Sequence, residues 1–173
     1  SIPGAHVIPK RSSQLPGVNF TIVKVSNTAP GQKPTVVFNI KDKKGVAIDP
    51  TKVTSLAFYM AGPTTDYTTR LSETNVQRSR ALTSLGDGNY QYVFNNTLPA
   101  DAKGSYAIAI QGYKAYNLTA PATYVNKASL LNVRDVGFNK VVYVPVTDKT
   151  PVARRTVVDL KKCETCHTAI DFI

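Results

Sequence analysis

Residues 86–116, GDGNYQYVFNNTLPADAKGSYAIAIQGYKAY, contain the pattern that decides the fold class. A Gly-Asp-Gly turn signal comes first, and Tyr90, Tyr92 and Phe94 then recur at every second position. Residues 105–116 alternate in the same way after a polar connection. Because successive side chains of a strand point to opposite faces, both halves predict β-strands with one buried face.

Shorter segments on both sides show the same period of two. In the first of them the alternation places Phe20, Ile22 and Lys24 on one face. Pro145, in the last, predicts an edge strand, because proline cannot donate a hydrogen bond to a neighbouring strand. The segments are residues 19–27, 35–42, 52–62, 127–137 and 139–146, with turn signals at Pro30-Gly31, Lys44-Gly45 and Gly62-Pro63.

Residues 63–80 interrupt this pattern. They are polar and rich in threonine, without a hydrophobic period, and they predict a long loop or an edge segment. Short β segments separated by turns, with almost no helical periodicity, are typical of antiparallel sandwiches. We therefore predict a mainly β fold, an antiparallel Greek-key sandwich or split barrel of the immunoglobulin or fibronectin kind.

The composition excludes several classes of protein. Of the 173 residues 42% are hydrophobic, too many for a disordered chain, and two cysteines are too few for a disulfide-rich scaffold. No apolar run approaches the length of a transmembrane helix, and no basic-then-apolar leader opens the chain, so we expect a signal peptide to be absent from it. The net charge is +10, but the basic residues are scattered without interleaved aromatics, so we expect no nucleic-acid binding.

The chemistry-bearing motif lies near the end of the chain, in Cys163-Glu164-Thr165-Cys166-His167. C-x-x-C-H is the attachment signature of c-type haem. Two thiols three residues apart lie on one helical turn and can both form thioethers with the vinyl groups of a porphyrin. The histidine that follows then lies under the iron as its proximal axial ligand. The motif predicts one covalently bound haem c.

Other uses of these residues remain as alternatives. A thiol-disulfide oxidoreductase would need a βαβ context, which a β domain does not supply. A zinc site needs four ligands, and the motif offers at most three. For the distal iron ligand the chain holds only His6, in the N-terminal arm, and Met60, at the end of a predicted strand, where core or rim packing is the ordinary interpretation; we expect neither to bind iron. No Ser-His-Asp set or paired carboxylates predict an enzyme.

The motif also divides the chain. Asp159 is a candidate N-cap for a short helix over residues 160–169 that carries the motif. Only six residues follow His167, too few for a haem pocket, so we expect the chain to be a piece of a longer polypeptide that supplies the distal ligand. The predicted organisation is an N-terminal arm (1–16), a β domain (17–149) and the truncated start of a haem-binding segment (150–173).

Four stretches resemble the outer-surface multihaem c-type cytochromes of metal-reducing bacteria, the OmcA/MtrC family. In that family a β domain precedes a multihaem domain, and an Arg-Arg-x-Val-Val-Asp run precedes the first haem motif. Arg154-Arg155 and residues 157–159 match that run, and Cys163, Cys166 and His167 match the first haem. This chain carries one haem motif where family members carry about ten. The resembling stretches are residues 25–42, 60–67, 98–113 and 150–167.

The resemblance implies extracellular electron transfer by an electron carrier. Terminal reduction of a metal is a role it could have as part of a longer multihaem protein. The partners would be other cytochromes or haem domains of the full-length chain, and acceptors such as metal oxides and soluble shuttles. The protein would be exported to the outer membrane, the bacterial cell surface or the periplasm. Around the haem, Arg154, Arg155, Lys161 and Lys162 are candidate contacts for the propionates or for an acidic partner.

An alternative function of a different kind, binding rather than electron transfer, remains open. The β domain could be a haem-free binding or adhesion module that acts as a docking scaffold, with the cysteine pair inert. Its support is the polar loop at residues 63–80 together with Tyr113, Tyr116 and Tyr124. The ordinary interpretation of those tyrosines is packing at the rim of the sandwich.

Overall fold

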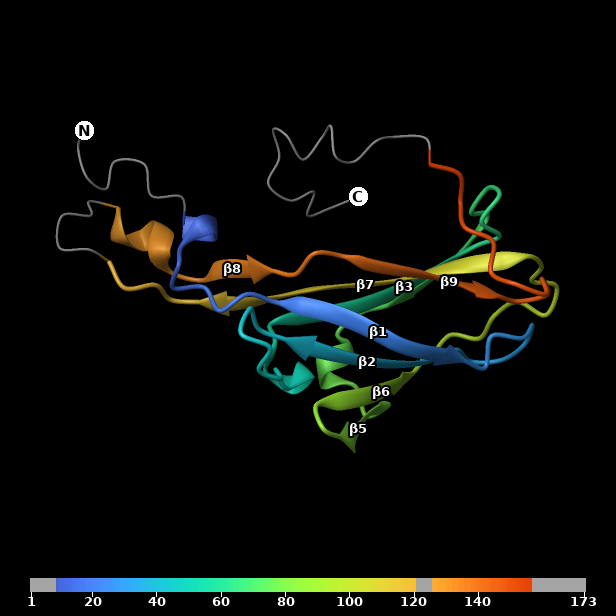
Figure 1. Cartoon of the computed structure of the whole chain (residues 1–173), viewed down its shortest axis with the longest axis horizontal. Coiled ribbons are helices and arrows are strands. Elements are labelled where there is room, and N and C mark those ends of the chain that lie inside the picture. Colours follow the sequence, from blue (N-terminus) through green and yellow to red (C-terminus); the bar gives the residue numbers. More distant parts are fainter. Residues whose placement is uncertain (1–8, 121–125, 157–173) are drawn as a thin grey trace.

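The computed structural model describes residues 9–120 and 126–156, which form two antiparallel sheets packed face to face (Figure 1). The sheets do not close into a barrel, so of the two predicted architectures the sandwich is the one observed. Sheet A has the order β1 (Asn19–Ser26), β2 (Thr35–Lys41), β6 (Asn89–Val93) and β5 (Leu82–Gly86). Sheet B has the order β4 (Thr69–Glu73), β3 (Ser55–Gly62) and β7 (Ser105–Tyr116), with β8 (Val133–Val136) and β9 (Lys140–Pro145) both paired with the far side of β7.

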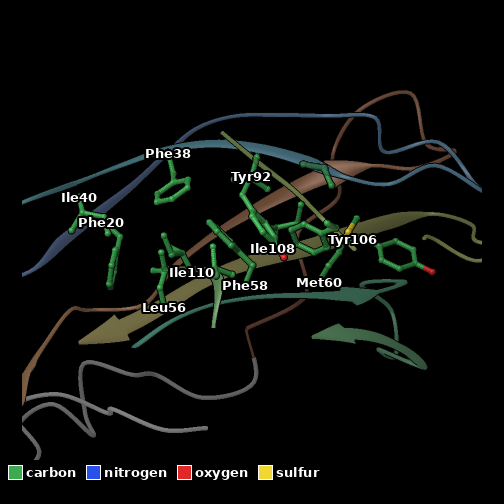
Figure 2. Packing of buried hydrophobic residues seen from close by; sticks show 14 of the residues in the cluster. Phe20, Phe38, Ile40, Leu56, Phe58, Met60, Tyr92, Tyr106, Ile108 and Ile110 are labelled. Atoms are coloured by element: carbon green, nitrogen blue, oxygen red, sulfur yellow. The ribbon is translucent and has the colours of Figure 1, made fainter. Parts of the chain in front are cut away.

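Aromatic side chains from both sheets form the centre of the core (Figure 2). Phe58 of β3 meets Phe38 of β2 edge to face, with ring centroids 5.1 Å apart, and stacks on Tyr92 of β6 at 5.8 Å. Phe94 lies 6.1 Å from Phe58. Tyr92 and Phe94 are almost completely buried, and Tyr90 is partly buried against the same cluster. The predicted alternation after the Gly-Asp-Gly turn is therefore confirmed.

The first strand departs from the predicted alternation. Phe20 and Ile22 pack against the core as expected, but the pairing of β1 with β2 shifts register between Ile22 and Lys24. A β-bulge adds one residue to a strand and reverses the faces of those that follow. Val23 is 55% exposed, as the alternation predicts, but after the bulge Val25, rather than Lys24, packs against the core.

Other segments were only partly predicted. Residues 63–80 contain the edge strand β4 and the 3-10 turn η3 (Val76–Arg78). Strand β5 was missed, because four of its five residues are exposed and show no hydrophobic period. The predicted strand at 127–137 is the 3-10 turn η4 (Lys127–Leu130) followed by β8, whereas Pro145 lies in an edge strand as predicted. The remaining 3-10 turns are η1 (Pro9–Arg11) and η2 (Pro50–Lys52).

A buried carboxylate joins the two sheets at β4. Glu73 is 3% exposed, and its carboxylate accepts hydrogen bonds from the Tyr92 hydroxyl of sheet A at 2.6 Å and from the Asn96 backbone N–H at 2.9 Å. The side-chain amides of Asn95 and Asn96 also donate to it. Burial by itself would raise the pKa of Glu73, but these hydrogen bonds outweigh it and hold the pKa below its usual value of 4.5.

A second, smaller core lies beside β8, where Leu15, Leu118, Leu130 and Val133 pack together. Leu15 falls within the segment predicted as an arm, and the chain beside it is held in place by polar contacts. The Gly17 backbone N–H donates to the carboxylate of Asp135 at 2.7 Å, and Lys43 donates to the Leu15 carbonyl at 2.8 Å.

We expect Asp135→Asn to stabilise the protein at pH 7, by about 0.5–1 kcal/mol, since the amide oxygen still accepts from Gly17. Burial raises the pKa of Asp135 above 3.8, despite the Gly17 N–H and Lys43. The contribution of this carboxyl is therefore full below pH 3.8 and is lost as the pH rises through the folded pKa. Urea denaturation of the variant and of the exposed control Asp101→Asn checks this; a loss of stability specific to Asp135→Asn contradicts it.

Candidate functional site

The residues predicted to bind the cofactor all lie between Arg154 and His167, near the end of the chain. Of the predicted site residues, Met60, Arg154 and Arg155 lie in the part that the structure describes. Met60 has no exposed surface and packs in the core of the sandwich (Figure 2). The haem motif Cys163, Cys166 and His167, the helix predicted around it, Lys161, Lys162 and His6 lie outside the described residues.

The chain that leads toward the motif is fastened to the start of β7. After β9, the backbone N–H groups of Val146 and Thr147 donate to the Gly104 carbonyl at 2.9 and 3.1 Å. Ser105, which is 1% exposed, donates its hydroxyl to Asp148 at 2.6 Å and accepts from the Val152 N–H at 2.9 Å. One buried serine therefore holds both ends of the loop at residues 148–152.

Arg154 continues this anchor. Its guanidinium lies 4.5 Å from the centre of the Tyr67 ring and donates to the Thr64 carbonyl at 3.1 Å. Burial and the neighbouring Tyr143 raise the pKa of Tyr67, although the Arg154 charge opposes them. The next residue, Arg155, is exposed. Of the two arginines predicted as propionate or partner contacts, Arg154 is thus already engaged by the sandwich and Arg155 is open to solvent.

We expect Arg154→Gln to release this anchor while the sandwich stays folded. The cation–π contact and the hydrogen bond to Thr64 are lost, which costs about 1 kcal/mol of local stability. Amide hydrogen exchange at Val152 should become several times faster, with β7 unchanged. Arg155→Gln is the matched control, because that side chain is exposed; equal exchange at Val152 in both variants would show that Arg154 does not hold the segment.

Cation–π pairs on the outer face of sheet B were not predicted from the sequence. The guanidinium of Arg134 lies 4.7 Å from the centre of the Tyr113 ring, and that of Arg70 lies 5.1 Å from the centre of the Tyr59 ring. Each pair joins residues on different strands, so only the strand register could have revealed it. A shallow depression of about 170 Å³ lies between Tyr59, Tyr113 and Arg134.

The tyrosines that suggested a haem-free binding module are only partly accessible. Tyr113 and Tyr116 are both half-buried, and Lys114 lies 5.3 Å from the centre of the Tyr116 ring. Tyr124 lies outside the described residues.

Residues 9–120 and 126–156 hold no group of three or more His, Cys, Asp or Glu side chains that could bind a metal ion. Within the same residues, no helix combines the length and apolarity that a membrane span requires.

Comparison with known proteins gives a similarity of fold. No protein-family model matches the chain. No curated protein matches it either. Among solved structures, MtrC from Shewanella baltica OS185 is similar, with a TM-score of 0.60 and 16% sequence identity. The similarity covers 89% of this chain and 28% of the MtrC chain, so the chain matches part of a much longer protein.

Proposed function

We propose that this protein carries electrons through one covalently bound haem c, as the β domain and first haem site of an extracellular electron-transfer cytochrome. The observation that carries the proposal is the C-x-x-C-H motif at Cys163, Cys166 and His167. It begins 18 residues after β9, the last described strand of a sandwich whose fold is similar to part of MtrC. The chain spans 28% of that protein, so electron transfer over a distance would need the remaining haem domains.

The donor set fits the group. The thiols of Cys163 and Cys166 would anchor the porphyrin as thioethers, and the imidazole of His167 would ligate the iron. When bound, a haem supplies an iron that takes up and releases single electrons. Ser105 binds the backbone of Val152, and Arg154 binds the carbonyl of Thr64. The chain that leads to the haem motif is therefore anchored to the sandwich at these two residues.

Met60 is a poor candidate for the distal ligand. Met60 has no exposed surface, and reaching an iron outside the sandwich would require opening the aromatic core. His6 lies outside the described residues, and a longer polypeptide could supply another ligand. Among the candidates within this chain, burial thus argues against Met60.

The proposed context is the bacterial cell surface. The redox partners would be other haem domains or cytochromes, and the acceptors would be metal oxides or soluble shuttles. The protein would act as a carrier of electrons, and reduction of a metal would belong to the full-length protein.

Co-expression with a c-type cytochrome maturation system tests the proposal. The purified protein should show a Soret band, and reduction by dithionite should produce sharp α and β bands. A colourless protein after successful maturation of a control cytochrome would instead favour the haem-free binding module.

A further inference from the structure

We propose that the outer face of sheet B is the docking surface for the haem-bearing segment 157–173, with the haem lying flat against that face. The outer face is defined here by Tyr59 of β3, Arg70 of β4, Ala109 of β7, and Val141 and Tyr143 of β9. The inference rests on the proposed function, because it requires a haem at the C-x-x-C-H motif.

The strand register brings these residues side by side. Tyr59 and Val141 both pair with Ala109, from opposite sides of β7. Two residues along β7, Ala107 pairs with Tyr143 on β9. The alternate residues of the same strands, such as Phe58 and Ile108, point into the core, so this set points away from it.

The face is apolar and partly uncovered. Val141 is 50% exposed, and Tyr59 and Tyr143 are half-buried. Ala109, between Tyr59 and Val141, carries no side chain beyond Cβ, and Ala107 occupies the same kind of position beside Tyr143. A planar macrocycle can bury its apolar face on such a surface and stack near its aromatic rings.

The charge on this face complements a haem. Arg70 is exposed beside Tyr59, and its guanidinium can pair with a propionate. Both carboxylates on the strands of sheet B point elsewhere, since Glu73 binds Tyr92 in sheet A and Asp135 binds the Gly17 N–H. An anionic group on the face therefore meets a cation without a competing carboxylate from these strands.

The last described residues are anchored close to the outer face of sheet B, within reach of the proposed docking surface. Val152 is held by Ser105 at the start of β7, and Arg154 by Tyr67, whose hydroxyl interacts with Tyr143 of the outer face. Figure 1 shows this last stretch, in red, turning away from sheet A after β9. Cys163 follows Thr156 by seven residues, a reach of at most about 25 Å. Ala109 lies only four residues beyond Ser105 along β7, about 13 Å away.

Tyrosine nitration of the matured protein tests the docking. Tetranitromethane labelling, mapped by peptide mass spectrometry, is compared between the haem-loaded protein and the haem-free double variant Cys163→Ser/Cys166→Ser. We expect Tyr59 and Tyr143 to react several times more slowly when haem is bound, while Tyr90 of sheet A reacts equally in both.

Val141→Glu supplies the matched perturbation, because it places a carboxylate in the apolar surface against which the macrocycle would lie. In the haem-loaded variant, nitration of Tyr59 should return to the haem-free rate. Val23→Glu is the control: Val23 is similarly exposed, at 55%, but lies on sheet A. Thermal unfolding of both variants confirms that they fold.

The outcomes separate the two proposals. Haem attached with equal nitration of Tyr59 in loaded and haem-free protein overturns the docking and leaves the proposed function standing. Protection that Val141→Glu and Val23→Glu leave equally intact also overturns it. Absence of covalent haem overturns both.

Discussion

Glu73→Ala is expected to lower the free energy of unfolding by about 3 kcal/mol. The variant leaves the buried Tyr92 hydroxyl and the Asn96 backbone N–H without their acceptor, and it opens a cavity between the sheets. It also frees β4, an edge strand that pairs only with β3 among the described strands. Denaturation in urea measures the loss.

The pH dependence gives this prediction a second readout. The pKa of Glu73 lies below 4.5 in the folded protein, so the unfolded chain binds more protons in this range. The carboxylate's contribution is therefore present above pH 4.5 and is lost as the pH falls through the folded pKa. Glu73→Gln should remove this part of the acid sensitivity.

Two further variants serve as controls for the effect of Glu73→Ala. Tyr92→Phe removes one donor, whereas Glu73 keeps those from Asn95 and Asn96, so a smaller loss of about 1–2 kcal/mol is expected. Asp66→Asn, at an exposed carboxylate, should change stability little. A Glu73→Ala variant as stable as Asp66→Asn would show that the carboxylate does not join the sheets.

Cys163→Ser/Cys166→Ser is expected to abolish covalent haem attachment completely, because no thiol remains to form a thioether. The sandwich should stay folded, since the core that the structure describes is built from residues 18–146. Visible absorption after acid-acetone extraction measures the bound haem, and circular dichroism measures the fold.

Thr165→Ser is the matched control inside the motif. It keeps both thiols, their spacing and His167, so it should retain a full complement of haem. Equal loss of haem in Thr165→Ser and in the double cysteine variant would mean that something other than thioether formation limits attachment.

Most of the sandwich could be predicted from local sequence, because a strand with one buried face repeats its apolar residues at every second position. The pattern failed where that condition failed. After Val23 a bulge reversed the faces of β1, so Val25 took the place predicted for Lys24, and in β5 most side chains are exposed, so no period exists to detect.

For the candidate site too, the local motif could be predicted from the sequence and the long-range contacts could not. Cys163, Cys166 and His167 are adjacent in the chain, so their spacing alone predicts a cofactor. Arg154 meets Thr64 from 90 positions away, and Arg70 meets Tyr59 from the neighbouring strand. Such contacts depend on how the strands pair, which no local pattern contains.

The central claim is that this chain holds one haem c through its C-x-x-C-H motif. Intact-mass spectrometry of the denatured, matured protein tests it most directly, with a pyridine haemochrome spectrum of the same sample. We predict a mass increase of one haem that survives denaturation and maps to the peptide containing Cys163 and Cys166. An unmodified mass, with both thiols free to react with iodoacetamide, would contradict the account.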